Sequence, residues 1–310
     1  EGGWPLTLPA QTPFPVKPVR LINPTTAGGQ PDVISRMIAQ RLAQLWGKPV
    51  VVDNRPSAGG IIAATLVAKA APDGHTLLYA VPNFVIIPAL QANLPYDPRK
   101  DFAGIAQVGF STNTLVVSSS LGVKSVADLV ALAKAQPGKL IYGSGASGTA
   151  GHLNGARFQL AAGIKVVHVA FKGGPDAVIE ILAGRSHFTV TTMGLALPFI
   201  REGKLLGLAV TSPQRSPVLP DAPSLSESYA EFKQPETSHG VLAPAATPRA
   251  IIQQISLDLA RVLNTAGMKA QLQAIAFTVA PTTPEEYDKL LGVQLESMAK
   301  LVVEAGLKAQ

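Results

Sequence analysis

The chain has 310 residues, of which 47% are hydrophobic and 15% are charged, so it is too apolar for a disordered protein and long enough for two buried α/β domains. It contains no cysteine, which excludes disulfides, thiolate nucleophiles and thiolate metal sites. The net charge of +6 comes from scattered Lys and Arg residues, and only 5% of residues are aromatic. This pattern disfavours nucleic acid and favours a small anion as partner.

Residues 1–15 are rich in proline and predict an extended N-terminal segment. Two units of the same kind follow, each a short apolar strand, a glycine loop and a helix. The first is the strand Val19–Ile22 with a loop at residues 23–30 and a helix that begins near Pro31. The second is the strand Val50–Asp53 with a loop at residues 54–60.

A third unit, at residues 140–163, has the most informative loop of the chain, Gly143-Ser144-Gly145-Ala146-Ser147-Gly148-Thr149. A helix follows it, capped by Ser147 or Thr149 and ended by Gly163. The first backbone N–H groups of a helix have no partner inside the helix, and the positive end of its dipole points outward. The loop is therefore predicted to bind a carboxylate or a phosphate.

Two sharper interpretations of this loop are disfavoured. The spacing of Gly143, Gly145 and Gly148 matches a dinucleotide fingerprint, but no acidic residue closes the next strand to bind the ribose. A serine hydrolase would use Ser144 or Ser147, but the Gly-x-Ser-x-Gly elbow is absent. We expect no enzyme, although a hydrolase of small esters stays the alternative.

Strands and helices alternate through the rest of the chain, which predicts mostly parallel sheets. Helices are expected at residues 125–135, 177–183, 195–201, 248–263 and 284–305, and residues 211–235 predict a long surface connection. Because every glycine loop follows the end of a strand, the loops can converge only if two sheets face each other across a hinge. We expect one domain at 16–118 plus 240–310 and another at 119–239.

The histidines lack the close spacing of a metal site, so no metal or other cofactor is expected. Asp32, in the first turn of its predicted helix, complements the helix dipole or orients a ligand. Arg55 holds its loop or pairs with the ligand. For Phe84 and His152, the sequence leaves two roles open: part of the cavity wall, or an ordinary structural role.

Short motifs along the chain carry a resemblance to a known family. They are Pro24 with Ala27-Gly28-Gly29 and Asp32, Asn54-Arg55-Pro56 with Ala58-Gly59-Gly60, Ala71-Pro72-Asp73-Gly74, Tyr142-Gly143-Ser144, Gly148 with His152-Leu153, Lys172-Gly173, and Leu219-Pro220-Asp221-Ala222-Pro223. From Pro15 onward the chain resembles the Bug family of periplasmic binding proteins.

The resemblance implies a two-domain α/β fold of the type II, Venus flytrap kind, whose hinged cleft binds a small carboxylate. It implies a monomeric, exported receptor in the periplasm that delivers the ligand to the membrane components of a tripartite tricarboxylate transporter. Because export removes the signal peptide, none is expected at the N-terminus. A sensor that binds the same ligand and signals to another protein is the remaining alternative.

Carried over by position, the resemblance gives the expected site. The ligand would be held by the backbone and hydroxyls of Thr25, Thr26, Ala27, Gly28, Gly29, Ser144, Ser147, Gly148 and Thr149. Further candidates for the cleft are Asp32, Ala58, Phe84, Phe171, Lys172, Thr191, Thr192 and Met193. Thr191 stands where many members of the family have an Asp that meets a ligand amine, so amino acids are disfavoured. The expected ligand is an aromatic or aliphatic mono- or dicarboxylate.

Overall fold

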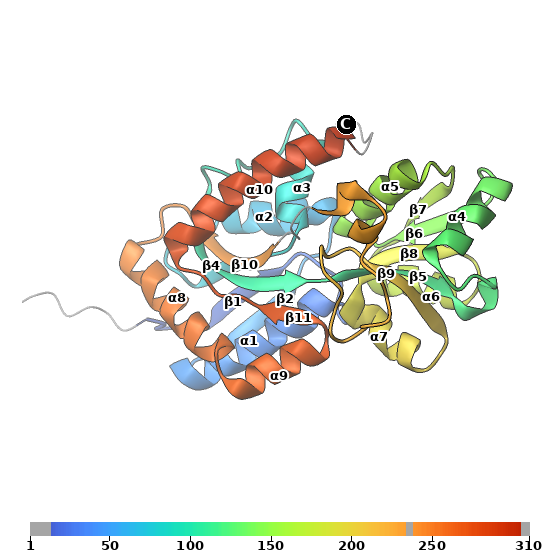
Figure 1. Ribbon diagram of the computed structural model, residues 1–310. Coiled ribbons are helices and arrows are strands. Elements are labelled where there is room, and N and C mark those ends of the chain that lie inside the picture. Colours follow the sequence, from blue (N-terminus) through green and yellow to red (C-terminus); the bar gives the residue numbers. More distant parts are fainter. Residues whose placement is uncertain (1–13, 234–237, 305–310) are drawn as a thin grey trace, which may run out of the picture.

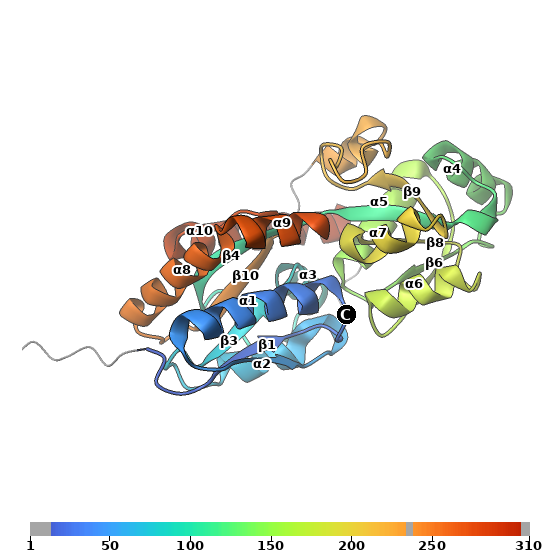
Figure 2. The same cartoon turned by 90° about the horizontal axis from the view of Figure 1, so that it is seen from below.

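The computed structural model describes residues 14–233 and 238–304. They form two lobes side by side, each built on one β-sheet with helices on both faces (Figure 1, Figure 2). The two-sheet α/β architecture predicted from the alternating pattern is confirmed. Of the predicted N-terminal segment, residues 1–13 lie outside the described residues.

The first lobe is built on a six-stranded sheet of order β11-β4-β10-β3-β1-β2. Its strands are β1 (Val19–Asn23), β2 (Val50–Asn54), β3 (Thr76–Ala80), β4 (Phe102–Ser111), β10 (Ser238–Pro244) and β11 (Phe277–Val279). Its helices are α1 (Gln30–Trp46), α2 (Ile61–Ala68), α3 (Asn83–Leu90), α8 (Arg249–Leu263), α9 (Ala266–Ala274) and α10 (Pro284–Glu304), with a 3-10 turn η1 (Ala58–Gly60) before α2.

This sheet separates two apolar cores because successive side chains of a strand point to opposite faces. On β3, Leu77 packs with α1, α8 and α9, whereas Leu78 packs with α2, α3 and α10. Both leucines are buried. The central strands therefore consist of consecutive buried residues instead of alternating apolar and polar ones. A sheet that is covered by helices on both faces requires this pattern.

The second lobe is built on a five-stranded sheet of order β7-β6-β8-β5-β9. Its strands are β5 (Asn113–Ser118), β6 (Ile141–Ser144), β7 (Val167–Ala170), β8 (Phe188–Thr192) and β9 (Leu205–Val210), and its helices are α4 (Val126–Ala135), α5 (Ala150–Ala162), α6 (Gly174–Leu182) and α7 (Met193–Arg201). Short 3-10 turns lie at Ser119–Leu121, Leu225–Glu227 and Ala230–Lys233. Helices α4 and α5 cover one face of this sheet, and α6 and α7 cover the other.

The chain crosses between the lobes along two strands. After β4, Thr112 alone separates the first sheet from β5 in the second, and β10 returns the chain to the first sheet. The predicted boundary at residue 118 was therefore wrong for β5, which pairs with β8 and β9. The polar stretch Ser111-Thr112-Asn113-Thr114 separates two apolar runs, but such a break does not show whether the next strand joins the same sheet or another one.

Both sheets are mixed, in contrast to the mostly parallel sheets predicted. Strand β10 runs antiparallel to both β3 and β4, and β5 runs antiparallel to both β8 and β9. The strands that carry the chain across the hinge are thus the ones that break the parallel pattern. The strands of the units β1-α1-β2 and β6-α5-β7 pair in parallel, and so do β1 and β3.

Several predicted elements agree closely with the structure. Strand β3 has the predicted bounds, and Ser125 caps α4 with its side chain. The sequence missed α3, α9 and β11. Helix α3 contains Pro88 and almost only apolar residues, so its sequence has neither an amphipathic period nor a cap to reveal a helix. In the described residues, no helix has the length and apolar character needed to span a membrane.

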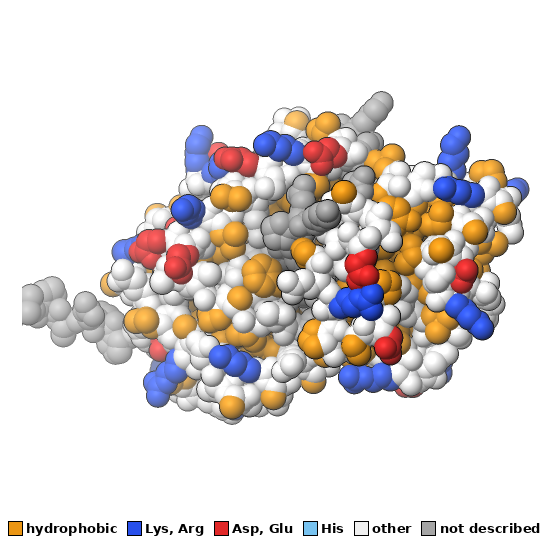
Figure 3. Space-filling model, viewed as in Figure 1, with side chains coloured by type: hydrophobic (Ala, Val, Ile, Leu, Met, Phe, Trp, Pro, Cys, Tyr) orange, Lys and Arg blue, Asp and Glu red, His pale blue; other side chains and the backbone are white. Residues whose placement is uncertain are grey.

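The lobes also touch beside the hinge. Leu153 and Ala156 of α5 belong to the same buried cluster as α3 and α10 of the first lobe. A Cβ at Gly148 would lie 2.6 Å from Cδ1 of Ile87, so the glycine loop packs tightly on α3. On the face shown in Figure 3, acidic and basic side chains are interspersed and form no area of one sign.

Candidate functional site

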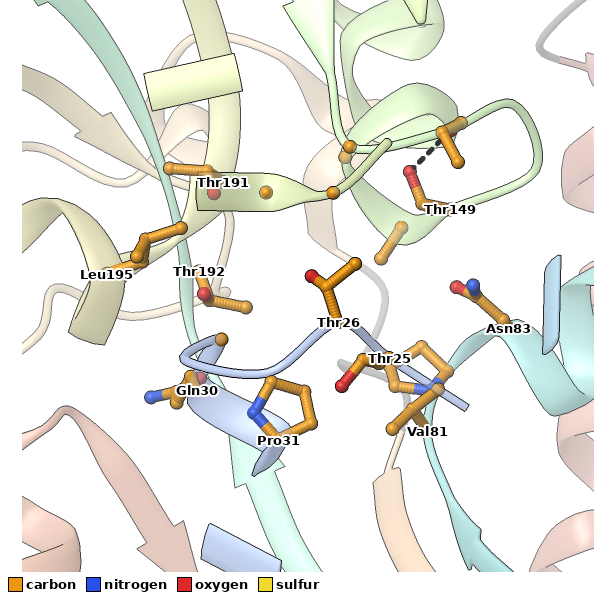
Figure 4. Close-up of a pocket in the computed structure, with 18 of the residues that line it drawn as sticks. Thr25, Thr26, Gln30, Pro31, Val81, Asn83, Thr149, Thr191, Thr192 and Leu195 are labelled. Carbon is orange, nitrogen blue, oxygen red and sulfur yellow. Dashed lines mark hydrogen bonds between the residues drawn. The ribbon is translucent and has the colours of Figure 1, made fainter. Parts of the chain in front are cut away.

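A cavity of about 150 Å³ lies between the two lobes. The loops after β1, β2 and β3 line it from the first lobe. The loops after β6 and β7, together with the end of β8 and the start of α7, line it from the second. Ser111, Asn113 and His239, from the strands that cross the hinge, complete the wall. Figure 4 shows side chains from both lobes around this cavity. The convergence of strand-to-helix loops that the sequence predicted is therefore present in the structure.

The N-terminal ends of five helices converge on the cavity. The residues immediately before α1, α3, α5, α6 and α7 all line it, and they are Gly29, Pro82, Thr149, Gly173 and Thr192. Except at α5, no side chain caps these helices. In the first turns of α3 and α7, the N–H of Phe84 donates to Val81 and that of Met193 donates to Thr112, so these two groups are not available to a ligand. The first N–H groups of α1, α5 and α6 have no such partner among the described residues, and all five dipoles direct positive potential toward the cavity. An anion is the chemistry that such a wall favours.

The charged residues of the wall also favour an anion. Lys172 is the only Lys or Arg among the described residues that line the cavity, and none of them is Asp or Glu. A ligand ammonium group would thus meet no counter-charge. Apolar side chains supply much of the remaining surface, namely Pro24, Pro31, Pro56, Val81, Pro175, Val190 and Leu195.

The loop after β1 is held in place by its own hydrogen bonds. The Asn23 side chain accepts from both the backbone N–H and the hydroxyl of Thr25, at 2.9 and 2.7 Å. Asn54 donates to the carbonyl oxygen of Thr25 at 3.1 Å and to the carboxylate of Asp32 at 2.9 Å. The loop therefore presents Thr25, Thr26 and Gly29 to the cavity in a preorganised shape.

Asp32 serves as the brace of this loop and does not line the cavity. It is only 4% exposed and accepts from the N–H of Gly28 and from Arg36. Burial alone would raise its pKa, but the hydrogen bonds from Arg36, Gly28 and Asn54 outweigh burial and hold the pKa below its usual value. The carboxylate is thus satisfied by the protein.

The loop at residues 143–149 was predicted to bind the anion, but the residues of this loop that face the cavity are not all the expected ones. Gly145, Ala146 and Thr149 line it, whereas Ser144, Ser147 and Gly148 do not. The Ser144 side chain is buried, donates to the carbonyl oxygen of Ala146 and lies 2.8 Å from Nε2 of His168. Ser147 is exposed. Neither serine is placed to attack a molecule in the cavity.

Thr149, and not Ser147, is the cap of α5. Its hydroxyl accepts from the N–H of His152 at 3.2 Å and donates to the carbonyl oxygen of Ala146 at 2.8 Å. His152 accepts from the N–H of Gly148 through Nδ1 and stacks on His168, with ring centroids 4.2 Å apart. Burial lowers the pKa of His168 to about 4, with a smaller contribution from His152. Burial also lowers the pKa of His152, so both imidazoles are neutral at pH 7 and belong to the scaffold of the loop.

The structure brings some of the expected site residues to the cavity and leaves others elsewhere. Those that line it are Thr25, Thr26, Gly29, Thr149, Lys172, Thr191 and Thr192. Those that do not are Ala27, Gly28, Asp32, Phe84, Ser144, Ser147, Gly148, Phe171 and Met193. The side chain of Ala58 lies outside what the structure describes. Arg55, an alternative ligand partner, instead pairs with Asp53.

The three apolar candidates are structural for identifiable reasons. Phe84 is buried in the core of the first lobe, where its ring meets Phe102 edge-on at 5.1 Å. Met193 is fully buried in an apolar cluster at the hinge. Phe171 lies over Gly143, whose missing side chain makes room for the ring. Position after a strand was the only signal for these residues, and it does not tell which side chain points inward.

The sequence missed several polar residues of the wall, of which Gln30, Asn83, Ser111, Asn113 and His239 carry hydrogen-bonding side chains. Gln30 is the last residue of the predicted loop and could have been included on that ground. Ser111, Asn113 and His239 come from the crossing strands, and only the tertiary fold brings those strands to the cleft. No group of three or more His, Asp and Glu residues in the described chain is arranged to hold a metal.

The chain can now be compared with known proteins. Residues 34–307 match the family model described as "Tripartite tricarboxylate transporter family receptor". The chain belongs to this family. Protein BugT of Bordetella pertussis is 31% identical over 298 residues, which cover 95% of this chain and 91% of BugT. The predicted resemblance to the Bug family is thereby confirmed.

Solved structures give the same result. Rpa4515 of R. palustris, determined with adipate, has a TM-score of 0.91 at 30% identity, covering 96% of this chain and 100% of that chain. The periplasmic binding protein BugD has a TM-score of 0.89 at 28% identity, with 96% of this chain and all of BugD covered. The periplasmic-binding-protein fold is confirmed. Members of this family are solute-binding proteins, some of them periplasmic.

Proposed function

We propose that the protein is a periplasmic receptor that binds a small carboxylate between its lobes and delivers it to the membrane components of a tripartite tricarboxylate transporter. The observation that carries the proposal is the convergence of five helix N-termini on one cavity that has Lys172 and no acidic residue in its described wall. Family membership supports the transport role. The structure with adipate, and that of MatC with bound malate, are relatives whose ligands are carboxylates.

The cavity volume limits the ligand. An engineered cavity of about 150 Å³ in another protein accommodates one benzene molecule, so a ligand of roughly six to ten non-hydrogen atoms fits this volume. Within that size, the apolar walls suit a short alkyl chain or one ring. We assign the contacts of the carboxylate to the N-terminal ends of α1, α5 and α6, together with the hydroxyls of Thr25 and Thr26, because charge-assisted hydrogen bonds from preorganised donors are strong.

The same geometry supports binding without catalysis. Ser144 is buried and Ser147 is exposed away from the cavity. A hydrolase would need a nucleophile within reach of a bound ester and a base beside it. The cavity wall does contain one serine beside an imidazole, because the Ser111 hydroxyl lies 2.9 Å from Nε2 of His239. No residue of the described chain orients this imidazole through Nδ1, and burial lowers the pKa of His239 to about 3, so it is a poor general base at pH 7. We therefore propose that the ligand is released unchanged.

A thermal-shift screen tests the proposal. The panel contains aliphatic monocarboxylates and dicarboxylates, aromatic carboxylates, amino acids and alkylamines, each at matched ionic strength. The expected result is a rise in melting temperature with at least one carboxylate and none with the amines, because ligand binding to the folded state stabilises it by mass action. Stabilisation by amines or amino acids, without any by simple carboxylates, contradicts the proposal.

A further inference from the structure

One side chain in the cavity wall has an unused hydrogen-bonding atom. Gln30, at the start of α1, is only 4% exposed and lines the cavity. Its Nε2 donates to the carbonyl oxygen of Ile275 at 2.5 Å. Its Oε1 is buried and has no hydrogen-bond partner among the described residues. Figure 4 shows Gln30 beside Thr192 and Leu195, at the end of the site away from Thr149 and Asn83.

The orientation of this amide is fixed by its partner. A carbonyl oxygen can only accept a hydrogen bond, so the amide group of Gln30 must present its NH₂ to Ile275. A flipped amide would place two acceptors against each other at 2.5 Å. The free atom is therefore an acceptor, and only a hydrogen-bond donor can satisfy it.

A second unsatisfied atom lies in the same wall. His239 is 1% exposed, and its Nε2 lies 2.9 Å from the hydroxyl of Ser111. Its Nδ1 is buried and has no partner among the described residues. Most buried polar side-chain atoms in native proteins are paired with protein or ordered water, and leaving one unpaired is costly. Both residues line one cavity, so the partner that these atoms require is an ordered water or a group of the ligand in that cavity.

The chemistry of the wall selects the donor. An ammonium group could donate to Gln30, but the described wall contains no Asp or Glu to balance its charge and does contain Lys172. An ionised second carboxylate has only acceptors and would face Oε1 of Gln30 without a proton between them. A hydroxyl group donates to the amide oxygen and carries no charge. It can also accept from, or donate to, an imidazole nitrogen.

We propose that the ligand is a small monocarboxylate that carries a hydroxyl group, and that Oε1 of Gln30 accepts a hydrogen bond from this hydroxyl. The inference rests on the proposed function, because it assumes that a carboxylate occupies the other end of the cavity. It makes Gln30 the residue that distinguishes this receptor's ligand from an alkyl acid of the same shape.

Matched pairs of acids test the inference on the full chain by calorimetric titration. Each pair exchanges a hydroxyl for a methyl group of similar size: γ-hydroxybutyrate with valerate, β-hydroxypropionate with butyrate, and para-hydroxybenzoate with para-methylbenzoate. Glutarate and γ-aminobutyrate extend the series to a second carboxylate and to an amine. In at least one pair, the hydroxy acid is expected to bind about fivefold or more tightly than its partner, as one hydrogen bond to a buried acceptor provides.

The variant Gln30→Met removes the acceptor and keeps the length of the side chain. It is expected to abolish the hydroxyl preference while the alkyl acid keeps its affinity within about twofold, because only the contact with the hydroxyl is lost. Gln253→Met, at an exposed position of α8, is the matched control and should retain the preference. The wild-type comparison uses no variant, so it remains decisive even if Gln30→Met fails to fold.

The outcomes separate the two proposals. If carboxylates bind but no hydroxyl preference exists, or glutarate or γ-aminobutyrate binds more tightly than every hydroxy acid, the inference is wrong and the receptor function stands. A hydroxyl preference that persists in Gln30→Met also overturns it. If no carboxylate of any kind binds, the proposed function and the inference both fail.

Discussion

Thr26 and Gly173 meet across the cavity, one from each lobe, so closely that the glycine has no room for a side chain. A Cβ on Gly173 would lie 2.5 Å from Oγ1 of Thr26. The backbone of Gly173 is extended, with φ at −163°, a conformation open to any residue. The glycine is therefore required by the contact between the lobes and not by its own dihedral angles.

This contact predicts the effect of adding one methyl group. Gly173→Ala should hold the lobes apart and weaken ligand binding, because overpacking a tight contact costs about 1 to 3 kcal/mol, which is roughly five- to 140-fold in affinity. Calorimetric titration with the best ligand of the screen measures the change. Gly267→Ala, where a Cβ would meet nothing within 4 Å, is the control and should bind normally.

A compensating change sharpens this test. Thr26→Ala removes the two atoms nearest to the added methyl group and leaves Cβ of residue 26 at 3.4 Å from it, an ordinary contact. In the double variant, the compaction of the protein on ligand binding, measured by solution X-ray scattering, should return toward that of Thr26→Ala alone. If Gly173→Ala compacts and binds like the wild type, the contact does not limit closure.

Thr149 and Ser147 should differ in what they contribute. The Thr149 hydroxyl caps α5 and also donates to Ala146, so Thr149→Ala should lower the free energy of unfolding by about 1 kcal/mol. Ser147 is exposed and lies outside the cavity wall, so Ser147→Ala should change neither stability beyond about 0.5 kcal/mol nor affinity. Urea unfolding and titration on the same samples check both. A marked loss of affinity in Ser147→Ala would return this serine to the site.

Lys172 should act mainly through its charge. It is exposed at the rim of the cavity wall, where a charge pair with the ligand is worth up to about 1 kcal/mol. Lys172→Met is therefore expected to weaken carboxylate binding up to about fivefold, with a smaller dependence of affinity on salt concentration than the wild type shows. Lys165→Met, exposed and outside the cavity wall, should leave both unchanged. Equal effects of the two variants would show that only net charge matters.

Two histidines, His239 fully buried and His168 partly buried, predict how the free energy of unfolding depends on pH. Burial lowers the pKa of His239 to about 3, and burial, with a smaller contribution from repulsion by His152 once it is protonated, lowers that of His168 to about 4. The unfolded chain titrates near 6.5, so it binds more protons than the folded protein below that pH. The stability contributed by neutral histidines is complete above pH 6.5 and is lost as the pH falls toward 4 and then 3.

The variant His239→Gln isolates one of these groups. Between pH 6.5 and 4, its free energy of unfolding should fall less steeply than that of the wild type, by at most about 1.4 kcal/mol per pH unit. Urea unfolding of the ligand-free proteins at several pH values measures the two slopes. Parallel slopes would mean that His239 is not kept neutral by the fold.

The sequence predicted the repeated strand, loop and helix units because their signals are local. Gly29 and Thr149 lie where short-range rules place a helix start, and both line the cavity. The exact side chains of the wall depend on how two lobes face each other. Phe84 and Met193 follow strands as a cavity residue would, but each points into a core. His239 gave no local signal, because its strand reaches the cleft only after pairing with residues more than a hundred positions earlier.

The most direct test of the central claim is a titration that changes only the charge of the ligand's head group. The carboxylate that gives the largest thermal shift is titrated by calorimetry beside its own primary amide and the corresponding amine, against the same wild-type protein. A cavity built from helix N-termini predicts that the carboxylate binds at least about tenfold more tightly than the amide and that the amine does not bind. Equal affinity for acid and amide, or binding of the amine, would contradict a carboxylate receptor.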